Sequence, residues 1–129
     1  MPGRVSLDSN IVIALFAGDQ EVVHEVERSG EVFVASIVLG ELYYGARNSA
    51  RTEDNLRRID DFAATTSVLF VDTDRAREYG KIKDQLRANG TPIPENDIWI
   101  AALCRQYGLS VVSRDRHFGL VDGIDLLIW

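Results

Sequence analysis

The stretch "VSLDSNIVIALF", residues 5–16, places one aspartate inside an otherwise almost unbroken apolar run. The length of the run and its valine, leucine and isoleucine content are typical of a buried strand that leads into a helix. An ionised carboxylate that is buried without a partner strongly destabilises a fold. Asp8 must therefore be hydrogen-bonded, be protonated, stand at a strand end in a cleft, or bind a metal.

Strand patterns and helix patterns alternate along the rest of the chain. We predict strands over residues 3–8, 31–36, 67–72, 109–115 and 124–129, and helices over residues 10–17, 20–30, 37–48, 52–64, 73–89 and 96–108. This alternation predicts an α/β fold with a central, mostly parallel, twisted sheet of about four to five strands, covered by helices on both faces. The chain length favours one domain over residues 1–129. Ligands of such sheets bind beyond the carboxyl ends of the strands, where the strand order reverses.

Composition limits the classes of partner. The chain has 20 acidic and 14 basic residues and a net charge of −6, which argues against nucleic-acid binding through bulk positive charge but leaves a local basic face open. Cys104 is the single cysteine, so an intramolecular disulfide is excluded and a reducing compartment is expected. No apolar run approaches the roughly 20 residues that span a bilayer. We expect a cytoplasmic protein without membrane association.

Four acids stand where the local pattern favours an apolar or neutral residue. Asp8 and Asp115 come at the carboxyl ends of predicted strands, Asp97 lies in the first turn of a helix, and Glu41 interrupts an apolar helix. Each acid alone has a structural explanation. Asp8 and Asp115 fit helix caps, Asp97 fits a helix dipole, and Glu41 fits the partner of an arginine.

As a group, the four acids indicate a metal site. Two unit charges about 4 Å apart repel by about 4 kcal/mol at an effective dielectric near 20, so a purely structural cluster is disfavoured. Either raised pKa values or a divalent cation relieves this repulsion, and oxygen ligands suit Mg²⁺ or Mn²⁺. We favour the cation. Such a site keeps waters, one of which becomes a nucleophile while the metal polarises a phosphoryl oxygen, and this chemistry is phosphodiester hydrolysis.

Four short motifs occur in order along the chain: "LDSNIVI" at 7–13, "VLGELYYGA" at 38–46, "PENDIWIAA" at 94–102 and "VVSRDRHF" at 111–118. Together they resemble the motifs of PIN-domain ribonucleases, in particular the VapC-type toxins of type II toxin–antitoxin pairs. The resemblance implies a PIN-like domain and a metal-dependent endoribonuclease that hydrolyses RNA. It also implies that the catalytic, metal-binding carboxylates are Asp8, Glu41, Asp97 and Asp115, and that Asn10, Asn96 and Ser113 orient ligands or waters.

The resemblance also implies partners. VapC-type toxins form homodimers that a short VapB-like antitoxin neutralises, in a heterotetramer or larger assembly. The C-terminal segment of the antitoxin lies across the active cleft, sometimes with an arginine beside the carboxylates. The RNA backbone would be contacted by arginines, for which the candidates are Arg47, Arg51, Arg114 and Arg116.

Several aromatic residues and one histidine lie close to the motifs. His117 has no acid partner at a spacing that predicts a general base, so we expect it to pack or to orient a neighbour. We expect Trp99 and Phe118 in the core, while Tyr43 and Tyr44 fit either packing or base stacking.

Other functions are weighed against the same residues. A haloacid-dehalogenase-like phosphatase would need a second acid at position 10, which is Asn, and a response-regulator receiver would need paired acids after the first strand and a late lysine. A PIN-like fold also serves as a catalytically silent module that binds RNA or protein. An RNA-processing nuclease without an antitoxin is the remaining alternative.

Overall fold

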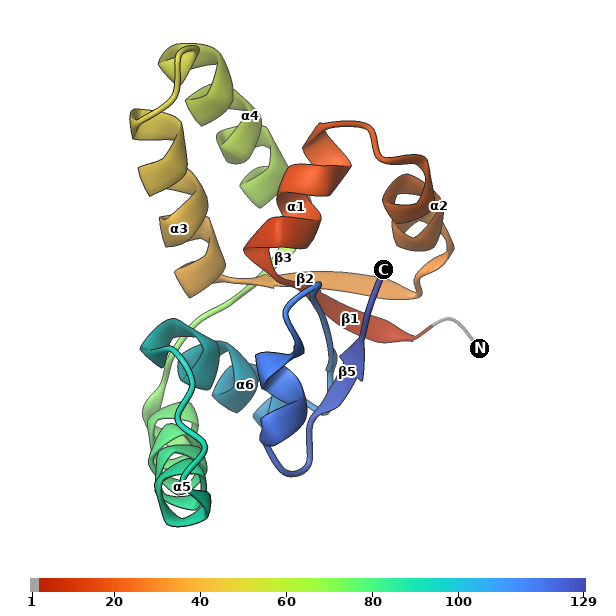
Figure 1. Ribbon diagram of the computed structural model, residues 1–129. Helices are drawn as coiled ribbons and strands as arrows, with labels where there is room; N and C mark the ends of the chain where they lie inside the picture. Colours follow the sequence, from red (N-terminus) through yellow and green to blue (C-terminus); the bar gives the residue numbers. More distant parts are fainter. Residues whose placement is uncertain (1–2) are drawn as a thin grey trace.

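The centre of the molecule is a five-stranded sheet in which every neighbouring pair of strands is parallel (Figure 1). The computed structural model describes residues 3–129. The strands are β1 (Arg4–Leu7), β2 (Glu31–Ala35), β3 (Ser67–Leu69), β4 (Ser110–Val112) and β5 (Asp125–Leu127). Their order across the sheet is β3-β2-β1-β4-β5. The predicted α/β class and parallel sheet are confirmed.

The strand order reverses at β1. The chain moves outward from β1 through β2 to β3, returns to β4 on the other side of β1, and then moves outward to β5. Ser6 is paired with Val111 and Leu7 with Val112, and the N–H of Asp8 donates to the carbonyl of Val112 at 2.9 Å. Since ligands of open parallel sheets bind beyond the strand ends at such a reversal, the ends of β1 and β4 mark the expected site.

Helices cover both faces of the sheet (Figure 1). They are α1 (Ser9–Phe16), α2 (Gln20–Arg28), α3 (Ser36–Arg47), α4 (Thr52–Thr65), α5 (Thr73–Asn89), α6 (Glu95–Tyr107) and the short 3₁₀ helix η1 (Arg116–Leu120). The helices α1 to α4 lie on one side of the sheet, and α5, α6 and η1 lie on the other. Within residues 3–129, none of the helices combines the length and the apolar character needed to cross a membrane.

The core lies between these layers and holds the strand ends in place. Leu7, Val34 and Val111 of the central strands are fully buried, as are Ile11 of α1 and Phe118 of η1. Strands that are covered on both faces are apolar at successive positions, which explains the continuous apolar runs in the sequence. The polar residues that follow β1 and β4 are therefore attached to strands that are buried on both faces.

The third strand is shorter than predicted. We expected a buried strand over residues 67–72, but β3 ends at Leu69, and Phe70 and Val71 are 67% and 44% exposed. β3 is an edge strand that pairs only with β2, so one side of its backbone has no neighbouring strand. After Leu69 the chain leaves the sheet and reaches Asp72, which caps α5.

Candidate active site

The four acids of the predicted cluster come from four elements that meet at the carboxyl edge of the sheet. Asp8 follows β1, Asp115 follows β4, Glu41 lies on α3, and Asp97 lies in the first turn of α6. The negative charges of Asp8, Asp115 and Glu41 all act on the pKa of Asp97, so the four carboxylates lie within electrostatic reach of one another. The structure thus brings all four predicted acids together.

Asp8 is buried, and each of its carboxylate oxygens has a protein donor. Oδ1 accepts from the backbone N–H of Ser9 at 2.9 Å, so Asp8 caps α1. Oδ2 accepts from the hydroxyl of Ser113 at 2.7 Å. The cap explanation is correct for one oxygen, while the other oxygen is held toward the loop after β4. Each oxygen keeps a lone pair that a cation can use.

Ser113 and Asn10 connect the two strand ends. Besides its bond to Asp8, the Ser113 hydroxyl accepts from Asn10 Nδ2 at 3.3 Å and from the backbone N–H of Asp115 at 2.9 Å. Asn10 Oδ1 accepts from the backbone N–H of Arg114 at 3.2 Å. This network fixes the loop that carries Asp115 relative to Asp8. Ser113 and Asn10 therefore lie where residues that orient the acids are expected.

Asp97 shows the crowding of negative charge most clearly. Its side chain is only 13% exposed. Burial first, and then the charges of Asp8, Asp115 and Glu41, raise the pKa of Asp97 to about 6. The first turn of a helix normally favours a carboxylate, so desolvation and repulsion outweigh the helix dipole here. A bound cation would instead favour the ionised form of Asp97.

Glu41 enters the cluster from α3 and has one oxygen without a partner. Among the described residues, the buried Oε1 has no hydrogen-bond donor, and Oε2 accepts from Asn96 Nδ2 at 3.5 Å. Burial raises the pKa of Glu41 and the charge of Asp8 adds to this effect, while the side chains of Asn96 and Ser9 oppose it. The alternative explanation of Glu41, an ion pair with an arginine, is not found, because Glu41 forms no ion pair within residues 3–129. A buried, unpaired carboxylate oxygen is suited to a cation or a water.

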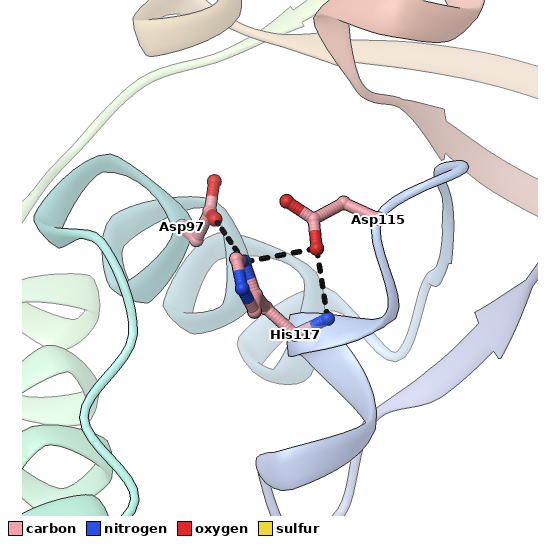
Figure 2. A group of neighbouring side chains, drawn as sticks. All are labelled: Asp97, Asp115 and His117. Atoms are coloured by element: carbon pink, nitrogen blue, oxygen red, sulfur yellow. Dashed lines mark hydrogen bonds and ion pairs between the residues drawn. The ribbon is translucent and has the colours of Figure 1, made fainter.

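His117 contacts two of the acids, which its place in the sequence did not predict. Figure 2 shows its imidazole between Asp97 and Asp115, with Nδ1 2.9 Å from Asp115 Oδ1 and 3.7 Å from Asp97 Oδ2. Of the two roles expected for His117, packing is wrong because its side chain is 49% exposed, while its contact with Asp115 is compatible with orienting a neighbour. Asp115 caps η1 by accepting from the His117 N–H at 3.0 Å. The two-residue spacing in "DRH" is the feature of the sequence that could have indicated the contact between His117 and Asp115.

The donor set of the cluster fits a divalent cation. One ligand atom each from Asp97, Asp115 and His117 lies within 4.8 Å of the other two. Within residues 3–129, no lysine or arginine forms an ion pair with any of the four acids. Together with the unpaired oxygen of Glu41, this leaves uncompensated negative charge that carboxylate-binding ions such as Mg²⁺ and Mn²⁺ neutralise.

The four candidate arginines differ in their present partners. Arg51 pairs with Asp54 at 2.8 Å. Arg114 pairs with Asp19 at 2.9 Å and also donates to the carbonyl of Trp129. Arg47 and Arg116 are exposed.

The aromatic residues near the motifs also differ in their surroundings. Phe118 is fully buried, as expected for the core. Trp99, which we expected in the core, is only half-buried and stacks on Tyr79 with ring centres 3.9 Å apart. Tyr43 donates to Asp60, whereas Tyr44 is 74% exposed. Phe118 thus supports η1, and Tyr44 is available to a partner.

A groove of about 470 Å³ runs from the acidic cluster between α1, α3 and α4. Ser9 and Glu41 line the end next to the cluster. Ile13 and Phe16 of α1 and Ile59 of α4 contribute apolar wall, and Ile13 is 58% exposed. The groove therefore joins an apolar surface to the acids.

Comparison with known proteins places this arrangement in a family. The family model described as the PIN domain matches residues 5–124. This chain belongs to the PIN-domain family. Its relatives include the ribonuclease VapC2 of Haemophilus influenzae, 39% identical over 98% of each chain. They also include the tRNA(fMet)-specific endonuclease VapC of Salmonella typhimurium, 33% identical over 98% of each chain.

Solved structures agree with the PIN-domain fold. The DNA-bound VapBC of Salmonella typhimurium has a TM-score of 0.88 at 32% identity, covering 100% of this chain and 99% of that one. VapBC2 of Rickettsia felis, bound to a promoter DNA fragment, has a TM-score of 0.90 over 98% of both chains, and at 24% identity it shows the fold alone. The expected PIN-like architecture is thus confirmed.

Proposed function

We propose that this chain is a divalent-metal-dependent endoribonuclease, the toxin of a VapBC-type toxin–antitoxin pair. The observation that carries the proposal is the convergence of four carboxylates from four elements with no lysine or arginine to neutralise them among residues 3–129. Relatives of at least 33% identity over nearly the whole chain are named as a ribonuclease and an endonuclease. The receiver and phosphatase alternatives offer no reason for Glu41 and Asp97 to join Asp8.

We assign the metal to Asp8, Asp97 and Asp115, with Glu41 at the edge of the site. A bound Mg²⁺ or Mn²⁺ supplies Lewis-acid polarisation of the scissile phosphate and activation of water. Ser113 and Asn10 hold Asp8 and the Asp115 loop in register, and Asn96 orients Glu41. Glu41 Oε1 is free to accept a hydrogen bond from the attacking water, and its raised pKa suits a proton acceptor.

RNA would be held through its phosphates at the rim of the site. Arg47 and Arg116 are exposed and form no ion pair with another residue from 3 to 129, so their guanidinium groups are available to phosphate. Arg51 and Arg114 would first have to leave Asp54 and Asp19. We therefore rank Arg47 and Arg116 above Arg51 and Arg114 as RNA contacts.

The groove between α1, α3 and α4 suits a segment of the antitoxin. Its apolar wall ends at Glu41, so an apolar segment that carries a cationic side chain would fill the groove and neutralise the acids. In the solved Salmonella typhimurium complex, VapB and VapC are found together on DNA. We propose the same type of partner for this chain, in a complex built on a toxin homodimer.

The test is cleavage of purified tRNA, rRNA and mRNA by antitoxin-free protein with Mg²⁺ or Mn²⁺, with and without EDTA. Transfer RNA is included because one relative is named for tRNA(fMet). We expect metal-dependent cutting that Asp97→Asn abolishes and Asp84→Asn preserves, since Asp84 is an exposed residue of α5 paired with Arg87. Absence of cutting on all three RNAs by folded, metal-bound wild type would favour the binding-module alternative.

A further inference from the structure

His117 adds a nitrogen donor to a cluster of oxygen donors. Its Nδ1 is 2.9 Å from Asp115 Oδ1 and 3.7 Å from Asp97 Oδ2 (Figure 2). Neighbouring ligands at right angles around an ion with bond lengths of about 2.1 Å lie about 3 Å apart. Both distances from Nδ1 fit two ligands of one ion, and one ligand atom from each of the three residues lies within 4.8 Å of the other two.

The backbone of His117 is fixed beside the cluster, while its imidazole is not packed in the core. The N–H of His117 bonds to Asp115 Oδ1, and Phe118, the next residue, is fully buried and anchors η1 in the core. The ring itself stays half exposed at the mouth of the cluster. An imidazole held against two acids without being needed for the core is available as a ligand.

We propose that His117 is a direct nitrogen ligand of the divalent ion and gives the site a preference for Mn²⁺, Co²⁺ and later transition ions over Mg²⁺. The inference rests on the proposed metal site and adds a ligand to its carboxylates. Imidazole binds transition ions well, whereas Mg²⁺ prefers oxygen donors. His117 thereby sets which ion the site selects, while the carboxylates provide the charge that any divalent ion requires.

The experiment is pulsed electron paramagnetic resonance of the untagged, antitoxin-free protein loaded with Mn²⁺. A directly bound imidazole gives modulation of the electron spin echo by ¹⁴N. The chain has two histidines, and the other, His24, is exposed on α2, so His24→Gln is the matched control. We expect ¹⁴N modulation in wild type and in His24→Gln, and its loss in both His117→Gln and His117→Asn.

Ion affinities provide the second measurement. We expect His117→Gln to weaken Mn²⁺ and Co²⁺ binding by about tenfold or more and Mg²⁺ binding by a smaller factor. Circular dichroism checks that the variants are folded. Mn²⁺ bound by wild type without ¹⁴N modulation would overturn the role of His117 and leave the carboxylate site standing. Failure of wild type to bind any of the three ions would overturn both the inference and the proposed metal site.

Discussion

Acids along α5 and its cap have lysine or arginine partners, whereas the acids at the carboxyl edge of the sheet have none among residues 3–129. Along α5 and its cap, each of three aspartates pairs with the arginine three residues later: Asp72 with Arg75, Asp74 with Arg77 and Asp84 with Arg87. Within residues 3–129, the edge acids have His117 as their sole ion-pair partner, through Asp97 and Asp115. The chain thus neutralises its acids on α5, whereas the charge of the cluster has to be neutralised by a bound ion or a partner.

The two groups also differ in what their charges do to stability. Exposed ion pairs contribute about 0–1 kcal/mol each because water and salt screen them. Asp97, in contrast, is desolvated beside three other acids, and this environment raises its pKa to about 6. Without a cation, the cluster therefore destabilises the fold that presents it, as expected of a site organised for binding.

The largest contrast should appear in catalysis. Asp8→Asn removes a charge but keeps a side chain that caps helices as well as aspartate does, so the fold should persist. We expect single-turnover RNA cleavage to fall by about a thousandfold or more, because several kcal/mol of transition-state stabilisation depend on the metal. Asp74→Asn on α5 should cleave at the wild-type rate. A folded Asp8→Asn protein with full activity would contradict the role of Asp8.

The next effect concerns stability and pH in EDTA. The pKa of Asp97 is about 6 in the folded state against an ordinary value of 3.8, so the folded state binds the proton more tightly. The associated stability is present below pH 3.8 and is lost as pH rises through about 6. At pH 7, Asp97→Asn should therefore stabilise the metal-free protein by about 1–3 kcal/mol in urea unfolding.

Asp84→Asn is the control for that experiment and should give no such gain. The difference between wild type and Asp97→Asn should shrink as pH is lowered from 7 to 4.5. Added Mn²⁺ should raise the stability of wild type and not that of Asp97→Asn. The same pH dependence in both proteins would contradict the charge crowding inferred for Asp97.

A smaller effect is expected when alanine replaces Ser113 but not when it replaces Ser110. Ser113 is buried and bonds to Asp8, Asn10 and Asp115, whereas Ser110 donates to the exposed Asp125. Ser113→Ala should cost about 1–2 kcal/mol of unfolding free energy, because it leaves buried polar groups unpaired. It should also weaken Mn²⁺ binding about tenfold by releasing the orientation of Asp8. Ser110→Ala should change neither property measurably, and equal losses in the two variants would contradict the network.

Much of this comparison could be predicted from the sequence. Asp8 and Asp115 each end an apolar strand, and the alternation of strands and helices predicts that those ends share one edge of the sheet. Glu41 interrupts an apolar helix, and this interruption can be read in the sequence. Local pattern was sufficient for Asp8 and Asp115 because they follow the ends of strands, and for Glu41 because it breaks an apolar pattern inside α3.

The rest of the site depends on tertiary geometry. Neither the unpaired Oε1 of Glu41 nor the raised pKa of Asp97 follows from spacing, because both depend on which helices pack beside β1. The contact of His117 with Asp115 was not predicted because the turn at the start of η1, rather than a helical or strand period, brings the two residues together. The predicted strand over residues 67–72 was too long because apolar content does not reveal where an edge strand leaves the sheet.

The smallest effect is expected for the neutralised acids themselves. Asp84 and Arg87 are 71% and 75% exposed with their charged atoms 2.8 Å apart. A double-mutant cycle with Asp84→Ala and Arg87→Ala should give an attractive coupling of only about 0.2–0.5 kcal/mol, which should disappear in 1 M salt. The same cycle with Asp97→Asn and Glu41→Gln in EDTA should give a coupling of the opposite sign, because like charges repel. An attractive coupling in both cycles would remove the difference between the surface acids and the cluster on which the metal assignment depends.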